Sequence, residues 1–329
     1  MRPEAPKLDV PQNALFLAPM AGVTDAPFRA LCVSQGADFT VTEMVSAKGV
    51  VLCPKEREEV AWLKAVSQGE RAFLQIFGSD PQIMAEMAAR NGGGPYVGID
   101  INMGCPAPKI VSGGDGSALL KSPELALRVA ESVVKASPLP VSVKMRLGWD
   151  EERLVYMELG KALQAAGVSM ITLHARTRNQ MYGGHADWDA IGRLAGSLSI
   201  PVVGNGDVLS GQDALDLLHR TGCRAVMVGR GAMGNPFIFA EIKAALRAES
   251  YARPAVRVRL ATALAQAQAL AAQKGEGLAV REMRKHMAWY TKGLRGSAQA
   301  RVRLNRAESL KAFEEILLQV WQENGDDAG

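Results

Sequence analysis

Short apolar runs alternate with longer amphipathic segments through residues 1–250 of the chain. Most of these runs are apolar at nearly every position, which is the pattern of strands buried on both faces of a parallel sheet. On this basis we expect eight strands, at residues 14–19, 38–43, 71–77, 98–102, 140–146, 169–174, 200–205 and 225–229.

The segments between the runs carry the start and stop signals of helices. Proline occupies a favoured first helical position in Ser-Pro-Glu at 122–124 and in Ser-Asp-Pro at 79–81, while Gly167 and Gly222 are placed to end helices. Eight strand–helix units predict a parallel sheet, and eight is the number that closes a TIM barrel. An open, doubly wound sheet is the competing architecture.

The pattern changes after about residue 250, where helical periodicity continues at 260–273, 279–292 and 308–322 without any strand signal. We therefore predict two domains. The first is an α/β domain at 1–250, a (β/α)8 TIM barrel, and the second is a smaller all-helical domain of two to four helices at 251–329.

Composition narrows the class of protein. With 329 residues, 48% of them hydrophobic, the chain can form a sizeable core. Its four cysteines lie far apart without a C-x-x-C pair, so we expect no metal, iron–sulfur cluster or disulfide framework, and a reducing cytoplasm fits best. Residues 1–11 mix proline with charge, and no segment approaches about 18 consecutive apolar residues, so neither secretion nor a membrane span is expected.

The net charge of +4 is unevenly distributed. Residues 253–329 hold 13 Lys and Arg against 8 Asp and Glu, whereas the rest of the chain is nearly neutral. Between Arg281 and Arg306 there are eight basic residues and one acid, and Arg281, Arg284 and Lys285 share a helical face. Such a face is either solvated or binds an anionic partner.

Cys105 is the most informative single residue. It lies in Ile-Asp-Ile-Asn-Met-Gly-Cys-Pro at 99–106, where a strand runs directly into a turn, and its thiol is therefore expected at the carboxyl end of a parallel sheet. A lone cysteine is usually a small buried hydrophobe. Here the flanking Gly104 and Pro106 and the polar, glycine-rich stretch at 107–116 indicate a presented thiol.

Other strand ends add polar groups to the same rim. Glycine turns at 204–206 and 229–231 precede helices and together predict a phosphate cradle. Gln75, Lys144 and His174 end apolar strands beside it, and a cation with an amide partner suits the polar edges of an isoalloxazine ring.

Taken in order, these motifs resemble the tRNA-dihydrouridine synthases. The resemblance rests on Leu-Ala-Pro-Met-Ala-Gly-Val-Thr-Asp at 17–25 and on the motifs at 100–106, 143–146, 173–176, 204–207 and 228–231. The stretch at 281–286, with Trp289 and Tyr290, resembles the C-terminal tRNA-binding domain of that family. Asn-Met-Gly-Cys-Pro-Ala-Pro-Lys at 102–109 is most similar to the bacterial B-type subgroup.

The resemblance implies an FMN-dependent reductase that converts uridine in tRNA to dihydrouridine, with NADPH as the reductant. In that chemistry a hydride from flavin N5 reaches C6 of uracil, and Cys105 acts as the general acid that protonates C5. By similarity, the flavin ring would be backed by Pro19, Met20 and Ala21 and held by Gln75, Lys144 and His174, and its ribityl phosphate by Asn205, Gly206, Asp207, Gly229 and Arg230.

A uridine inside folded tRNA must leave its stack before it can react, so the surrounding backbone needs a protein surface. The residues expected to bind the substrate are Asn102, Lys109, Arg146 and Arg176 in the barrel and Arg281, Arg284 and Lys285 in the helical domain. Two alternatives stay open. One is an enzyme similar to dihydroorotate dehydrogenases that acts on free pyrimidines, and the other is a non-catalytic tRNA-binding protein.

Overall fold

The computed structural model describes residues 8–53 and 58–326. The predicted domain ranges 1–250 and 251–329 also include residues 1–7, 54–57 and 327–329, which lie outside the described residues.

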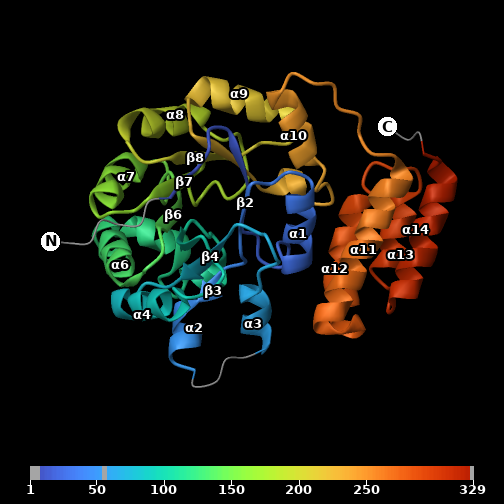
Figure 1. Ribbon diagram of the computed structural model, residues 1–329, viewed down its shortest axis with the longest axis horizontal. Coiled ribbons are helices and arrows are strands. Elements are labelled where there is room, and N and C mark those ends of the chain that lie inside the picture. Colours follow the sequence, from blue (N-terminus) through green and yellow to red (C-terminus); the bar gives the residue numbers. More distant parts are fainter. Residues whose placement is uncertain (1–7, 54–57, 327–329) are drawn as a thin grey trace.

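The central element is one parallel sheet that closes on itself (Figure 1). Its strands follow the order β2-β1-β9-β8-β7-β6-β5-β4-β3, and an additional pairing of β2 with β4 closes the barrel. The bounds are β1 (Ala14–Leu17), β2 (Phe39–Val41), β3 (Val45–Ser46), β4 (Ala72–Phe77), β5 (Gly98–Met103), β6 (Val141–Arg146), β7 (Met170–His174), β8 (Val202–Asn205) and β9 (Ala225–Val228). The TIM barrel is therefore confirmed over the open sheet, and all eight predicted strands are present.

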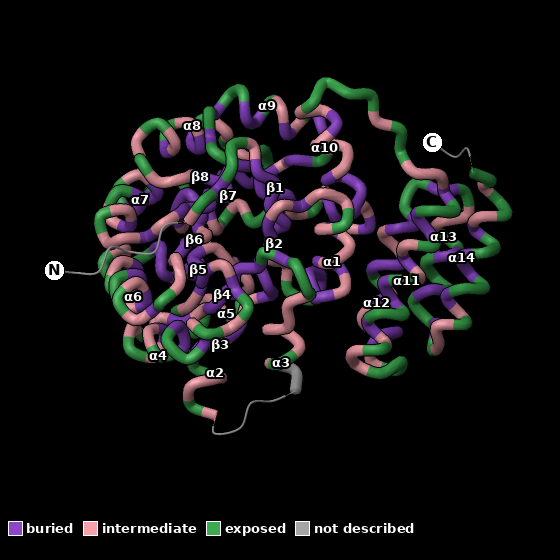
Figure 2. Tube along the Cα trace, in the orientation of Figure 1, coloured by how far each residue is buried: buried purple, intermediate pink, exposed green. Residues whose placement is uncertain are grey.

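Helices surround the sheet and bury its outer face (Figures 1 and 2). Pro81 and Pro123 start helices as expected, and Gly222 ends one with φ of 61°. The barrel helices are α1 (Ala26–Ser34), α2 (Ala47–Val51), α3 (Glu58–Lys64), α4 (Pro81–Asn91), α5 (Pro108–Val111), α6 (Pro123–Ala136), α7 (Tyr156–Ala165), α8 (Trp188–Ser197), α9 (Gly211–Thr221) and α10 (Ile238–Leu246), with short 3₁₀ turns at Gly116–Lys121 and Arg230–Ala232.

The barrel interior is apolar at one end and polar at the other. Phe16, Phe39 and Phe73 fill the amino-terminal end, and the rings of Phe16 and Phe39 stack with centroids 4.6 Å apart. Since side chains two residues apart share a face of a strand, the position above Phe73 on β4 is Gln75, which is also buried. An apolar floor thus supports a polar layer at the carboxyl ends of the strands.

The described part of the chain ends in four helices that have a hydrophobic cluster of their own. They are α11 (Val256–Lys274), α12 (Glu276–Tyr290), α13 (Ser297–Leu304) and α14 (Leu310–Asn324), and Figure 1 shows them packed beside one another. Helix α11 contacts α1 of the barrel. No helix in the described residues is long and apolar enough to cross a membrane.

His286 on α12 connects these helices to the barrel. Its Nε2 atom lies 3.4 Å from the carbonyl oxygen of Gly22, while Nδ1 lies 3.2 Å from Nε2 of Gln266, whose Oε1 accepts a hydrogen bond from the Tyr290 hydroxyl. A carbonyl only accepts, so Nε2 carries the proton and Nδ1 accepts from Gln266. Burial lowers the pKa of His286 to about 4, which keeps the ring neutral at physiological pH.

Candidate active site

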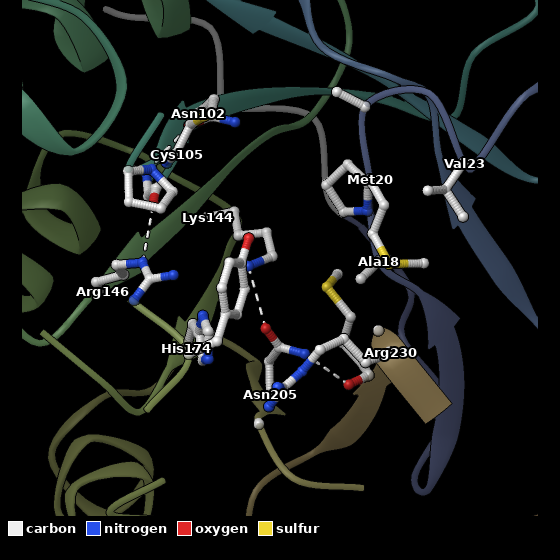
Figure 3. A pocket seen from close by; sticks show the side chains of 18 of the residues that line it. Ala18, Met20, Val23, Asn102, Cys105, Lys144, Arg146, His174, Asn205 and Arg230 are labelled. Atoms are coloured by element: carbon white, nitrogen blue, oxygen red, sulfur yellow. Dashed lines mark hydrogen bonds between the residues drawn. The ribbon is translucent and has the colours of Figure 1, made fainter. Parts of the chain in front are cut away.

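A cavity of about 620 Å³ opens at the carboxyl ends of the strands (Figure 3). Parallel strands bring their ends to one rim of the barrel, which is where enzymes of this fold place their active sites. The cavity is lined by all the residues predicted to bind a cofactor, namely Pro19, Met20, Ala21, Gln75, Lys144, His174, Asn205, Gly206, Asp207, Gly229 and Arg230. Cys105, Asn102 and Arg146 line it as well.

Cys105 sits on a turn that is held from both sides. Asn102 Oδ1 accepts hydrogen bonds from the backbone N–H groups of Cys105 and Gly104, at 2.9 and 3.1 Å. On the other side, the backbone N–H and the hydroxyl of Ser117 donate to the carbonyl of Cys105. Gly116 has φ of 60°, and a Cβ there would lie 2.9 Å from that carbonyl, so only glycine lets the next segment pass so closely.

Lys144 places a cation inside the cavity. Its Nζ donates to Asn205 Oδ1 at 3.1 Å, a bond drawn in Figure 3, and Asn205 in turn donates to the carbonyl of Met227. Burial and, to a smaller extent, the charge of Arg146 lower the pKa of Lys144 to about 8, although the carboxylate of Asp100 acts to raise it. Because the hydrogen-bond partner of Lys144 within the described residues is a neutral amide, the site is suited to an anionic ligand.

His174 is neutral in this environment. Burial lowers its pKa well below the ordinary value, and the surrounding cations lower it further. A neutral imidazole has one N–H donor and one acceptor nitrogen, so His174 can serve either kind of polar partner.

Asp207, which follows the glycine turn at 204–206, forms ion pairs with two arginines. Its carboxylate accepts bonds from Arg176 at 2.7 Å and from the N–H of Ala186, and it forms an ion pair with Arg230 at 3.2 Å. Burial acts to raise the pKa of Asp207, but the bonds from Ala186 and Arg176 and the charge of Arg230 lower it below its ordinary value. The Arg230 side chain is still 47% exposed and remains available at the cavity mouth.

Arg146 and Arg176 anchor the loop that follows β7. Arg146 donates to the carbonyls of Gly104, Thr177 and Met181, and it thereby links this loop to the Cys105 turn. Arg176 donates to the carbonyls of Gly183 and Gly184 as well as to Asp207, and it does not line the cavity in the described part of the chain. Both arginines are buried.

The basic residues predicted to contact tRNA phosphates lie on two helices, α5 and α12. Lys109 is exposed on α5, just beyond the Cys105 turn, and Arg281 and Lys285 are exposed on α12. The Nζ of Lys285 lies 2.9 Å from where a Cβ of Gly22 would be, so its charge is close to the loop that lines the cavity. Arg284 is half-buried, because its guanidinium donates twice to the carbonyl of Ala307.

Sequence reasoning missed Tyr182, which also lines the cavity. Its ring centroid lies 6.4 Å from that of His174 and 5.5 and 5.3 Å from the guanidinium carbons of Arg146 and Arg230. The signal in the sequence is a tyrosine directly before Gly183-Gly184, but it lies in the loop after β7 and not at the end of a strand, where polar residues of the rim are expected.

A closed parallel barrel whose rim carries a thiol, a lysine and a neutral histidine in one cavity defines an enzyme of the TIM-barrel class. Similarity to known proteins then gives the family. The model of the family described as Dihydrouridine synthase (Dus) matches residues 16–324. The chain belongs to the dihydrouridine synthase family.

Curated relatives agree with this assignment over most of their length. The chain is 38% identical over 310 residues to a probable tRNA-dihydrouridine synthase of Rickettsia conorii, covering 93% of each chain. It is 38% identical to tRNA-dihydrouridine synthase B of Pseudomonas aeruginosa, covering 91% of this chain and 90% of the relative. The B enzyme of Xanthomonas axonopodis pv. citri is 39% identical, with 90% and 89% covered. The expected family and its bacterial B-type subgroup are therefore confirmed.

Among solved structures, histamine dehydrogenase from Rhizobium sp. 4-9 matches 98% of this chain and 65% of its own, with a TM-score of 0.55 and 10% sequence identity. At that identity the likeness supports the fold alone.

Proposed function

We propose that this protein reduces specific uridines of tRNA to 5,6-dihydrouridine, with FMN as its cofactor and NADPH as the reductant. The names of its relatives support the reaction. The structural observation that carries the proposal is a half-buried thiol, Cys105, on a turn fixed from both sides and facing a cavity that also contains Lys144.

The residues around the cavity fit a flavin. Its volume of about 620 Å³ falls within the usual range for cofactor sites. Pro19, Met20 and Ala21 would lie behind the ring, and Gln75, Lys144 and His174 would bind its polar edges. When bound, FMN would supply the hydride that C6 of uracil receives, and NADPH would then reduce the flavin again. Lys144 is the cation that would balance the negative charge of a reduced ring.

The phosphate end would lie at the two glycine turns. Gly206, Gly229 and the side chains of Asn205 and Arg230 line that part of the cavity. The carboxylate of Asp207 would repel a phosphate, so we propose that Asp207 contributes its backbone N–H and holds Arg230 in place.

Cys105 would complete the reduction. Once C6 has received a hydride, negative charge accumulates at C5 and O4 of the uracil, and the S–H bond of Cys105 breaks as its proton forms a C–H bond at C5. The thiolate that remains would take up a proton from solvent, which restores the thiol.

Asn102 and Arg146, which line the cavity, would contact the everted base, while Lys109, Arg281 and Lys285 would contact tRNA phosphates. We propose that Arg176 and Arg284 act indirectly, by fixing the loop after β7 and the segment that follows α13. In this proposal residues 1–250 form the FMN-binding catalytic domain and residues 251–329 the tRNA-binding domain, in a cytoplasmic enzyme.

The test uses purified protein, NADPH and tRNA that lacks dihydrouridine, and the product is quantified by nucleoside mass spectrometry. Dihydrouridine should form, and the protein should carry a flavin absorbance band. Free uracil, uridine monophosphate and orotate are offered in parallel. Turnover of a free pyrimidine without turnover of tRNA would favour the dihydroorotate-dehydrogenase-like alternative, and a colourless protein that only binds tRNA would favour the non-catalytic one.

A further inference from the structure

A row of buried polar side chains runs from the Cys105 turn into the middle of the barrel. Asn102 Nδ2 donates to Gln75 Oε1 at 2.9 Å, and Gln75 Nε2 donates to Asp100 Oδ2 at 2.7 Å. The hydroxyl of Ser142 donates to the other oxygen of Asp100 at 2.5 Å. Every donor in this row points toward Asp100.

The direction is set from the Cys105 end. Backbone N–H groups can only donate, so Asn102 must turn its oxygen toward Gly104 and Cys105 and its NH₂ group toward Gln75. Gln75 must then present its oxygen to Asn102, which leaves its NH₂ group facing position 100. An acceptor is therefore required there, and an ionised carboxylate is a side chain that can only accept.

Burial makes this requirement strict. Asp100 is 2% exposed, Gln75 1% and Asn102 7%, so solvent cannot readily replace a missing partner. Leaving a buried polar group without its partner costs more than the bond itself contributes. In the described part of the chain, Asp100 does not line the cavity, whereas Gln75 and Asn102 do.

We infer that Asp100 is a positioning residue that sets the orientation of the Gln75 and Asn102 amides and, through them, holds the turn that carries Cys105. The chemical role of Cys105 rests on the proposed function, but the hydrogen-bond row does not. A simpler role for Asp100 would be to balance the charge of Lys144, and the test must separate charge from direction.

Asp100→Asn removes the charge and keeps the direction. The new amide can turn its oxygen to Gln75 Nε2 and donate its NH₂ to the oxygen of Ser142. Asn102→Asp does the opposite, because the new carboxylate still accepts from the turn but places an oxygen against Gln75 Oε1. If Gln75 flips to relieve that contact, its oxygen meets Asp100 instead.

Combining Asn102→Asp with Asp100→Asn should reverse the row and satisfy it again. The new amide at position 100 would donate to Gln75 Oε1 and accept from Ser142, while Gln75 Nε2 would donate to the new carboxylate at position 102. The reversal also turns the Gln75 amide around in the cavity, so the double variant should regain its stability while retaining flavin poorly.

The readouts are the thermal midpoint and hydrogen–deuterium exchange at the Gly104 and Cys105 amides, with a peptide from α14 as the reference. Asn102→Asp should speed exchange at these amides about tenfold and lower the midpoint, and the double variant should recover most of both changes, as expected for coupled neighbours. Asp100→Asn alone should change exchange by less than about twofold.

Two results would overturn the inference. One is a double variant that is no better than Asn102→Asp, whether or not it folds, and the other is an Asp100→Asn variant that disturbs the turn as much as Asn102→Asp does. Neither readout depends on tRNA reduction. A protein that shows the expected rescue but leaves tRNA uridine unreduced would refute the proposed function and leave the role of Asp100 standing.

Discussion

Lys144 should destabilise the cofactor-free protein, and replacing it with methionine should therefore stabilise that form. Burial lowers the pKa of Lys144 from 10.5 to about 8. At ~1.4 kcal/mol per pH unit, this difference means that the charged lysine costs the folded state about 3 kcal/mol at neutral pH. Methionine keeps the apolar stem without the charge, but it leaves Asn205 Oδ1 without its donor, at a cost of about 1 kcal/mol. The net gain should be about 2 kcal/mol.

The stability difference between the wild-type protein and Lys144→Met should depend on pH. Between pH 8 and 10.5 the unfolded chain still holds the Lys144 proton while the folded protein has lost it, so wild-type stability rises with pH through this window. The advantage of Lys144→Met should therefore shrink toward zero, or reverse, as the pH approaches 10.5.

Urea unfolding of flavin-free protein at pH 7 and pH 10 measures both effects, with Lys161→Met on the exposed surface of α7 as the matched control. The control should be nearly neutral at both values. A Lys144→Met protein that is less stable than wild type at pH 7, or whose advantage does not change with pH, would refute this account of the lysine. The same variant should lose flavin, because in our proposal Lys144 balances the charge of the reduced ring.

Three further predictions concern the thiol, the basic face and the domain contact. Cys105→Ala should leave flavin reduction by NADPH nearly intact and slow reoxidation by tRNA by ~10² to 10⁴, so an unchanged stopped-flow reoxidation rate would contradict a general-acid role. Arg281→Ala combined with Lys285→Ala should weaken tRNA binding and reduce the salt dependence of log Kd by roughly one unit for each lost phosphate contact, whereas Lys311→Ala on α14 should change neither. The folded pKa of His286 is about 4 against an ordinary 6.5, so its contribution to stability is lost as the pH falls from 6.5 to 4, and His286→Gln should lose less stability than wild type over that range.

The barrel could be predicted from the sequence because its strands are buried on both faces and separated by capped helices. Some elements escaped prediction, and two of them show the physical reasons. Strand β3 has only two residues, Val45 and Ser46, which is too short to show any periodicity. Helix α13 reads Ser-Ala-Gln-Ala-Arg-Val-Arg-Leu and buries just Ala300 and Leu304, so it has almost no apolar stripe.

The cavity lining was predictable for a different reason. Parallel strands converge at their carboxyl ends, so polar residues that end apolar runs must meet there. The sequence alone does not show which distant oxygen atoms accept hydrogen bonds from each arginine. Arg284 follows the same helical face as Arg281 and Lys285, yet its guanidinium is bonded to Ala307, and Arg176 is bonded to Gly183, Gly184 and Asp207. Those partners exist only once loops far apart in the chain have been placed.

The loop that lines the cavity beside Met20 is held by both parts of the molecule. Gly22 donates its N–H to the buried carboxylate of Glu43 in the barrel, and its carbonyl faces the N–H of His286 on α12. A second contact lies at Gly234, where a Cβ would come within 2.7 Å of the side chain of Trp289. Helix α12 therefore supports a loop of the cavity wall and also carries the exposed basic residues Arg281 and Lys285. An enzyme for free pyrimidines needs no such surface, whereas one that must hold tRNA while a base enters the barrel benefits from placing both roles on the same helix.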